Sequence, residues 1–284
     1  MPSLEALLSR RRTVFFDGAM GTMLQRAGLL PGERSDMMNI RAPEAVFEIH
    51  RAYVDAGSDI ILTNTLGANA HALSESGHSP KDVIEAAVAS ARRAANGRAL
   101  VALDVGPVGE LMEPHGALTP EDAYKLFREQ IEAGASAGAE LVAVETMSDL
   151  DELSAAVTAS RDACALPVLA MMTFGSSGRT YTGVAPADFV RRAEALGVAA
   201  LGINCSLEPR SSLPVFRELA AISKTPLIAK LNAGLPDSDG RYGLTPEEFA
   251  GQMLEYKALG VRIAGACCGS TPEFIRALVS AFAD

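Results

Sequence analysis

The stretch RIAGACCGSTPE, residues 262–273, combines a short apolar run, two adjacent cysteines and a helix start. The run Arg262–Ala266 is apolar without alternation, which is typical of a parallel strand buried on both faces. Thr271, Pro272 and Glu273 then supply an N-cap, a first-turn proline and a first-turn acid. The stretch predicts a strand, a loop and a helix in that order.

The same order of apolar run and helical pattern occurs eight times along the 284 residues. Proline and acidic residues also begin helical patterns after Ala42, Thr119 and Thr245. Glycines 57, 138, 197 and 260 fall where a helix must end before the next strand. The eight predicted strands are Thr13–Phe16, Asp59–Leu62, Ala99–Leu103, Glu140–Val144, Pro167–Met172, Ala200–Ile203, Pro226–Lys230 and Arg262–Ala266.

Eight βα units without a linker or a shift in composition predict a single (β/α)8 TIM barrel, one α/β domain over residues 1–284. The alternative is a doubly wound open sheet, because alternation alone does not show closure. The turn DGAMGT (17–22) lacks the G-x-G-x-x-G spacing of a dinucleotide-binding sheet, so the barrel is favoured.

Composition excludes several classes of partner. Twenty-five basic against 35 acidic residues give a net charge of −10, which disfavours nucleic acid. No apolar stretch approaches the roughly 20 residues of a membrane span, and the N-terminus lacks the order of a secretory signal. Four cysteines do not form an extracellular disulfide framework, so we expect reduced thiols in a cytoplasmic protein with no membrane partner.

Polar residues follow every predicted strand, at the rim where barrel enzymes place their active sites. Caps and turns account for some such residues, but the complete set indicates one functional rim. The strand-end residues are Asp17, Asn64, Thr65, Asp104, Glu145, Thr173, Asn204, Cys205, Asn232, Cys267 and Cys268.

Three cysteines carry the most specific chemistry of this set. Cys205 follows the sixth predicted strand and Cys267 and Cys268 follow the eighth, so a closed barrel brings them to one rim. Three thiolates with one open position predict a tetrahedral catalytic zinc site, with one Zn²⁺ per chain. The alternative is that these are small buried hydrophobic residues, which is how we interpret Cys164.

The other strand-end residues have two interpretations each. Glu145 can bind the ammonium group of an amino acid, or cap a helix or pair with an arginine. Asp17 lies in a glycine-bordered turn whose exposed N–H groups can receive a carboxylate, or it belongs to an ordinary βα turn. Thr65, beside Asn64, and Asn232 can contact a ligand or stabilise turns. Asp104 is interpreted as bracing a loop.

The remaining polar groups carry less information. The histidines at 50, 71, 78 and 115 fall in helices and loops and are interpreted as surface or packing residues. Two acids on one rim can also imitate a glycosidase pair, but the sequence does not set their separation.

Several motifs together resemble the zinc-dependent homocysteine S-methyltransferase family, in family order from about residue 13 to 280. The resemblance is greatest to the homocysteine-binding domain of cobalamin-dependent methionine synthase. Leu231 and Ala266 replace a proline and a glycine that are common in the family, and no folate- or corrinoid-binding domain follows residue 284. The motifs are FDGAMGTMLQ (16–25), TNTLGAN (63–69), DVGPVGEL (104–111), ETM (145–147), GRTYTG (178–183), INCSLEP (203–209), KLNAGLP (230–236) and GACCGSTPE (265–273).

The resemblance implies a role for each matching residue. Cys205, Cys267 and Cys268 match the zinc ligands, which are also the catalytic residues, and Asn232 matches a position near the metal. Glu145 matches the residue that contacts the homocysteine amino group. Positions around the amino-acid head are matched by Asp17, Ala19, Met20 and Thr65.

The implied reaction is methylation of homocysteine to methionine after zinc has deprotonated its thiol. The implied methyl donor is methylcobalamin on a separate corrinoid protein; S-methylmethionine, S-adenosylmethionine and betaine are alternatives. A second alternative is a non-catalytic zinc–thiolate protein for metal storage or redox sensing, although such a protein needs no amino-acid pocket.

Overall fold

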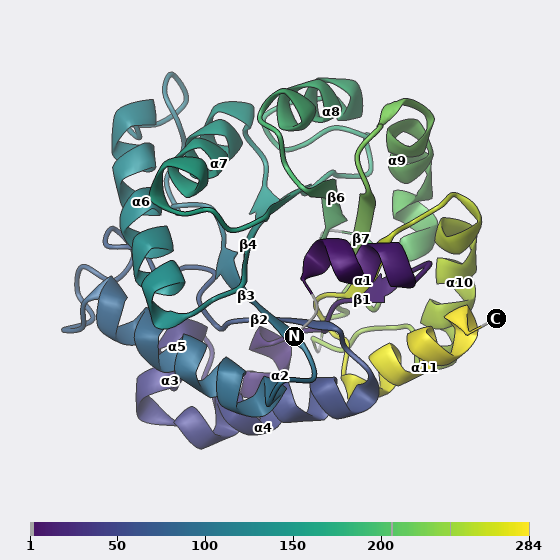
Figure 1. Ribbon diagram of the computed structural model, residues 1–284, viewed down its shortest axis with the longest axis horizontal. Helices are drawn as coiled ribbons and strands as arrows, with labels where there is room; N and C mark the ends of the chain where they lie inside the picture. Colours follow the sequence, from purple (N-terminus) through teal and green to yellow (C-terminus); the bar gives the residue numbers. More distant parts are fainter. Residues whose placement is uncertain (1–2, 206, 239, 284) are drawn as a thin grey trace.

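The computed structural model describes residues 3–205, 207–238 and 240–283. Across these residues, eight parallel strands form one sheet in the order β1-β8-β7-β6-β5-β4-β3-β2. Figure 1 shows the strands as an inner ring with the helices outside it. The strands are β1 (Val14–Phe15), β2 (Ile60–Leu62), β3 (Leu100–Val105), β4 (Leu141–Met147), β5 (Val168–Met172), β6 (Ala200–Asn204), β7 (Leu227–Leu231) and β8 (Ile263–Ala266).

Contacts between the first two strands close the sheet into a barrel. Phe16 forms a parallel bridge with Ile60, and the Asp59 N–H donates to the Phe15 carbonyl at 2.7 Å. β1 also pairs with β8 in the register Val14 to Ile263. The (β/α)8 barrel is therefore confirmed, and the doubly wound open sheet is excluded.

Most helices begin at the proline and N-cap residues that mark helix starts in the sequence. Proline occupies the first turn of α4 to α6 and of α8 to α11, where its missing N–H is not needed. Thr119 and Thr245 accept N–H bonds as N-caps, whereas the Thr271 hydroxyl contacts the Glu273 carboxylate instead. The helices are α1 (Leu4–Arg10), α2 (Gly21–Arg26), the 3-10 turn η1 (Ser35–Met37), α3 (Met38–Arg41), α4 (Pro43–Ala56), α5 (Pro80–Ala95), α6 (Pro120–Ala137), α7 (Leu150–Ala163), α8 (Pro186–Ala195), α9 (Pro209–Ile222), α10 (Pro246–Ala258) and α11 (Pro272–Phe282).

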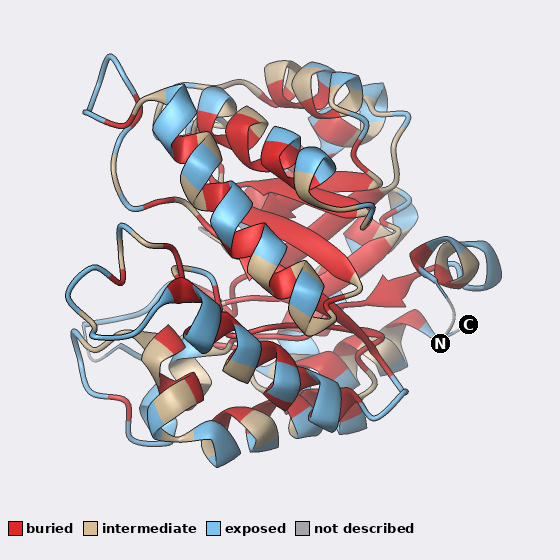
Figure 2. Ribbon diagram, turned by 60° about the vertical axis from the view of Figure 1, so that its left-hand side comes forward, coloured by how far each residue is buried: buried red, intermediate tan, exposed pale blue. Residues whose placement is uncertain are grey.

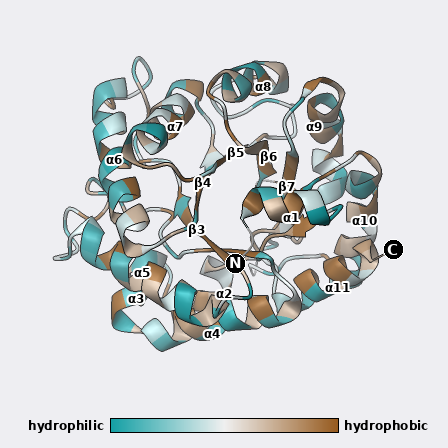
Figure 3. Ribbon diagram, in the orientation of Figure 1, coloured by the Kyte–Doolittle hydropathy of each residue, from teal (hydrophilic) through white to brown (hydrophobic). Residues whose placement is uncertain are grey.

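Apolar side chains fill both the barrel and the layer between strands and helices. The strands are buried along their length, while the helices are buried on their inner sides (Figure 2). Hydropathy follows the same division, with hydrophilic residues on the outer helices (Figure 3). Inside the barrel, Leu4 and Leu7 of α1 pack with Phe16, which follows β1, and with strand residues such as Leu141 and Ile228. Helix α1 therefore covers the amino-terminal end of the barrel and leaves the other rim for function.

Strand boundaries differ slightly from the predicted ones. β3 and β4 extend to Val105 and Met147, two and three residues beyond the predicted ends, so Asp104 and Glu145 lie within strands. None of the helices in the described ranges is long and apolar enough to cross a membrane.

A buried acid beside the β3 loop gives the fold a predicted pH dependence. Glu152 of α7 is 4% exposed, and its Oε1 accepts the Val108 N–H at 2.8 Å. Burial raises the pKa of Glu152 from its usual 4.5 to about 7, against the opposing effect of that hydrogen bond. The folded protein thus holds the proton more tightly, and stability falls as the pH rises from about 4.5 to about 7.

Glu152→Gln removes this charge and keeps the acceptor oxygen. We expect the variant to gain stability relative to the parent between pH 5 and pH 8, by up to about 3 kcal/mol. Urea unfolding at both pH values measures the difference. A stability difference that does not change with pH would contradict the prediction.

Candidate functional site

Three cysteine side chains converge at the carboxyl-terminal ends of the strands. Cys205 follows β6, Cys267 and Cys268 follow β8, and their sulfur atoms all lie within 4.8 Å of one another. The Sγ atoms of Cys205 and Cys268 are 3.7 Å apart. Parallel strands β6 and β8 flank β7, so residues 62 positions apart in the chain meet at one point.

Backbone bonds and one glycine fix the two cysteine loops. The Cys205 N–H donates to the Lys230 carbonyl at 3.0 Å, and Cys205 has a left-handed φ of 57°. The Cys267 N–H donates to the Leu231 carbonyl at 2.6 Å. Gly269 has a φ of 81°, and a Cβ there would lie 2.1 Å from the Tyr242 ring. Glycine after the paired cysteines is therefore required both by the turn and by the tyrosine that packs on it.

The sulfur geometry fits a zinc ion. Zinc–sulfur bonds of about 2.3 Å in a tetrahedron place neighbouring sulfurs about 3.8 Å apart. The measured 3.7 Å between Cys205 and Cys268 agrees with this spacing. Soft thiolates favour zinc over magnesium or calcium. Cys164 lies elsewhere, at the end of α7 before β5, where its thiol donates to the Ser160 carbonyl at 3.4 Å.

A cavity of about 180 Å³ adjoins the sulfur cluster. It brings together most of the predicted substrate-binding positions, but neither Thr65 nor Asn232 lines it. The lining residues are Asp17, Gly18, Ala19, Met20, Gly21, Thr22, Ser35, Leu62, Thr63, Asn64, Leu66, Asp104, Glu145, Lys230, Cys267 and Cys268.

The Asp17 turn is held by Tyr53 and Ser270. Asp17 Oδ2 accepts the Leu62 N–H at 2.8 Å. The Ala19 N–H donates to Ser270 Oγ at 3.0 Å, and the Tyr53 hydroxyl donates to the Ala19 carbonyl at 2.8 Å. The Ala19 N–H is thus already bonded within the protein.

Thr65 is occupied by contacts within the protein. It is fully buried, its hydroxyl donates to the Asp104 carbonyl at 2.7 Å, and it shares a hydrogen bond with the Thr63 hydroxyl at 2.6 Å. Asn64 Nδ2 donates to the Ser35 carbonyl at 2.6 Å. Thr63 and Asn64 rather than Thr65 line the cavity.

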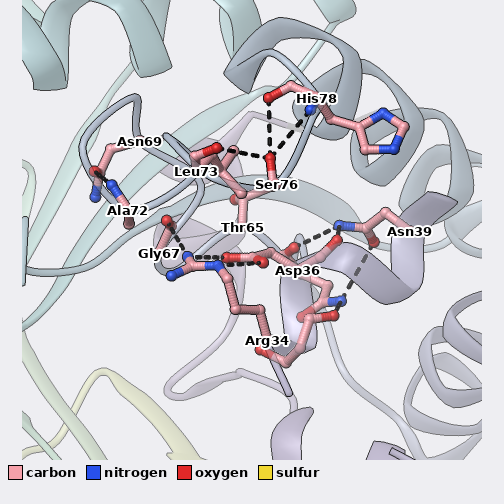
Figure 4. Close-up of polar contacts among 12 residues, drawn as sticks. Arg34, Asp36, Asn39, Thr65, Gly67, Asn69, Ala72, Leu73, Ser76 and His78 are labelled. Carbon is pink, nitrogen blue, oxygen red and sulfur yellow. Dashed lines mark hydrogen bonds and ion pairs between the residues drawn. The ribbon is translucent and has the colours of Figure 1, made fainter. Parts of the chain in front are cut away.

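A second set of contacts holds the loop that follows β2. Arg34 pairs with Asp36 at 2.6 Å and donates to the Gly67 carbonyl, and Asn39 Nδ2 donates to the Asp36 carbonyl at 2.7 Å (Figure 4). These bonds tie the loops after β1 and β2 together at the border of the cavity.

Asn232 lies at the end of β7, between the two cysteine loops. It is buried, and its Oδ1 has no hydrogen-bond partner within the described ranges. An unpaired buried acceptor is costly, so this oxygen is suited to a cation or a donor from a ligand.

Glu145 is aimed by a distorted segment of β4. The register shifts between Val144 and Met147, and Thr146 has a φ of 62°, which is strained for a β-branched residue. Asn204 holds Thr146 there, with Oδ1 accepting its N–H at 2.9 Å and Nδ2 donating to its hydroxyl at 2.8 Å. Strain of this kind concentrates at functional sites.

Lys230 lines the cavity, although no role was predicted for it from the sequence. It is 3% exposed, and its Nζ lies 3.5 Å from Glu145 Oε2. Burial alone would lower the pKa of Lys230, but the charges of Glu145, Cys267 and Asp17 outweigh burial and raise it. A lysine inside the apolar run PLIAK is costly to bury without a partner, and this signal could have identified it.

Asp104 both braces its loop and lines the cavity. Its backbone braces the loop, because its N–H donates to the Thr63 hydroxyl and its carbonyl accepts from Thr65 and Gln130. The residue also lines the cavity. Burial, and next the Glu145 charge, raise the pKa of Asp104 well above its usual value. Burial likewise raises the pKa of Asp17 to about 7, partly offset by Lys230.

The histidines lie away from this cavity. His71, His78 and His115 are exposed. His50 is fully buried in α4, and its ring nitrogens have no hydrogen-bond partner among the described residues. Burial lowers the pKa of His50 to about 4, so the ring is neutral and packs as an apolar group.

A closed (β/α)8 barrel with convergent cysteines and a polar cavity at its strand ends has the form of a barrel enzyme. The profile of the homocysteine S-methyltransferase family matches residues 14–282. The chain belongs to this family. Its members act as methyltransferases on homocysteine, and the sulfur cluster and the acidic cavity agree with such a substrate.

Known proteins resemble the chain over nearly its whole length. It is 31% identical to a methionine synthase of Mycobacterium tuberculosis and 31% identical to that of Mycobacterium leprae, covering 96% of this chain in each case. The chain spans about a quarter of the length of these relatives, 25% and 24% respectively.

Solved structures agree with the barrel and its family. The metallated form of the homocysteine methyltransferase MmuM from Escherichia coli superposes with a TM-score of 0.85 at 25% identity. The match covers 98% of this chain and 99% of MmuM. The oxidized form of MmuM matches with the same TM-score and identity.

Proposed function

We propose that residues 1–284 form one domain that methylates the thiol of homocysteine to give methionine, with one zinc ion held by Cys205, Cys267 and Cys268. The observation that carries this proposal is the convergence of three sulfurs within 4.8 Å of one another, with those of Cys205 and Cys268 at 3.7 Å, beside an acidic cavity. None of the cysteines in the described ranges forms a disulfide, which suits a reducing compartment, so we place the domain in the cytoplasm.

The residues of the chain have separable tasks in this reaction. Bound zinc would deprotonate the substrate thiol and leave its sulfur nucleophilic at neutral pH. Asp17 and Glu145 bind the ammonium group, and Ala19 and Met20 shape the turn beside it. Asn232 lies near the metal, between the cysteine loops. Thr65 holds Asp104 in place through its hydroxyl, which donates to the Asp104 carbonyl. Such positioning accounts for much of the rate gain in a group transfer.

The methyl group must come from a donor at the open rim. Methylcobalamin on a separate corrinoid protein is the donor that we favour, because the relatives that the chain resembles are methionine synthases. S-methylmethionine, S-adenosylmethionine and betaine are the alternatives. The transfer forms a sulfur–carbon bond in methionine as the donor's bond to the methyl group breaks.

A donor assay tests the proposal. Zinc-loaded protein is incubated with homocysteine and each donor in turn, and methionine is measured by mass spectrometry. We expect methionine with one donor and no product without protein. A protein that binds zinc but neither binds homocysteine nor forms methionine would instead be a storage or redox-sensing protein. The acidic cavity beside the sulfurs argues against that outcome.

A further inference from the structure

One buried serine joins the paired cysteines to the turn that follows β1. Ser270 lies three residues after Cys267 and is 1% exposed. Its hydroxyl donates to the Cys267 carbonyl at 2.7 Å and accepts the Ala19 N–H at 3.0 Å. A hydroxyl has a single proton, so its donation to Cys267 leaves its lone pairs for the Ala19 N–H. The two bonds form a chain from the turn to a proposed zinc ligand, and bonds in such a chain polarise one another.

Two segments meet at this serine, and we call them the β1 turn (residues 18–20) and the paired-cysteine loop (residues 267–270). Among the described residues, the bond from Ala19 to Ser270 is the one direct hydrogen bond between them. A Cβ at Gly18 would lie 2.6 Å from Ser270 Oγ, so this close approach requires glycine. Both segments line the cavity, the turn with all three of its residues and the loop with its two cysteines.

A metal ion at the three sulfurs would act on the paired-cysteine loop first. The sulfurs lie within 4.8 Å of one another, and those of Cys205 and Cys268 are 3.7 Å apart. Thiols without a metal interact with one another only weakly, whereas a bound zinc ion fixes each sulfur at a corner of a tetrahedron. The backbone of Cys267 is fixed together with its sulfur, and so is the carbonyl that Ser270 contacts.

We infer that Ser270 is a positioning residue, which transmits zinc occupancy from the paired-cysteine loop to the β1 turn. Zinc fixes the Cys267 carbonyl, this carbonyl orients the Ser270 hydroxyl, and the oriented hydroxyl holds the Ala19 N–H. The turn at the cavity is thus ordered before the substrate arrives. Coupling between two sites is reciprocal, so a ligand that holds the turn also strengthens zinc binding. The inference rests on the proposed function, because it takes zinc as the ion at the three cysteines.

Amide hydrogen exchange of the metal-free and the zinc-loaded chain tests the inference without an activity measurement. Exchange is followed by mass spectrometry in peptides that cover the β1 turn and the paired-cysteine loop, with a reducing agent present. In the wild type we expect zinc to slow exchange about 10-fold in the turn and to slow exchange in the loop as well. In Ser270→Ala, zinc should still slow exchange in the loop, but its effect on the turn should fall below about 2-fold.

Three further variants separate transmission from a structural role. Ser270→Thr keeps the hydroxyl and should retain the effect of zinc on the β1 turn. Ser160→Ala removes another buried serine hydroxyl, which donates to the Ala156 carbonyl within α7, and should behave as the wild type. Tyr53→Phe removes the bond at 2.8 Å to the Ala19 carbonyl. Exchange in the turn should then become faster with and without zinc, while the ratio of the two rates stays unchanged.

The outcomes are distinct. If Ser270→Ala keeps the wild-type ratio of exchange rates at the β1 turn, the serine does not transmit zinc occupancy and the inference falls. It also falls if Tyr53→Phe loses this ratio together with Ser270→Ala, because general loosening of the turn would then explain both results. A wild type that binds zinc without any change at the turn is equally contrary to the inference. If the wild type binds no zinc, the proposed function itself fails.

Discussion

Replacing Cys205 with alanine is expected to abolish zinc binding and methyl transfer together. Its sulfur lies 3.7 Å from that of Cys268, and the three sulfurs define the corners of one site. Two thiolates from adjacent residues leave the ion with half of its tetrahedral ligands, which is too few for a stable site. We expect zinc to fall from about one per chain to below about 0.1, and the rate to fall about 10³-fold or more.

Cys164→Ala is the matched control, because Cys164 lies at the other end of the barrel with a bond to the Ser160 carbonyl. It should retain zinc and activity. Metal is measured by atomic emission after dialysis against a weak chelator, and circular dichroism checks the barrel. If Cys205→Ala kept its full zinc content and activity, the metal site would have to lie elsewhere.

The fold could be predicted because each strand and helix of a parallel barrel has a recognisable local sequence pattern. Each strand is buried on both faces and reads as an apolar run, such as ALGI before Asn204. Proline and acids mark helix starts, as at Pro246 with Glu247 and Glu248. No local pattern predicts the closure of the barrel, because closure depends on the contact between Phe16 and Ile60, which are 44 residues apart. It was inferred from the number of units.

The location of a site residue was predictable where it follows from that residue's position at the end of a strand. Contacts that depend on three-dimensional packing were not predictable. Cys205 and Cys267 follow strands, so their convergence follows from barrel geometry. Glu145 was interpreted as binding a ligand ammonium group, or as a helix cap or an arginine partner, and its ion pair with Lys230, three strands away in the sheet, was not predicted. The bond between Ala19 and Ser270 joins residues 251 positions apart, and no local pattern indicates it.

One glycine inside a strand shows how tightly the barrel supports the cysteine loops. Gly202 of β6 pairs with Ile228 of β7, and a Cβ at this position would lie 2.0 Å from the Ile228 carbonyl oxygen. That oxygen belongs to the backbone of the neighbouring strand and cannot move without disturbing the sheet. Gly202→Ala is therefore expected to lower the free energy of unfolding by about 3 kcal/mol or more.

Gly251→Ala makes the same chemical change where nothing lies within 4 Å of the new carbon, on the exposed side of α10. Alanine is the better helix former, so this variant should gain about 0.5 to 1 kcal/mol. Denaturant unfolding of both variants measures the change in the free energy of unfolding, which should be negative for Gly202→Ala and positive for Gly251→Ala. Because β6 leads directly into Cys205, whose N–H bonds to the Lys230 carbonyl, Gly202→Ala should also weaken zinc retention while Gly251→Ala should not. A Gly202→Ala protein as stable as the parent would mean that β6 and β7 separate more easily than their register implies.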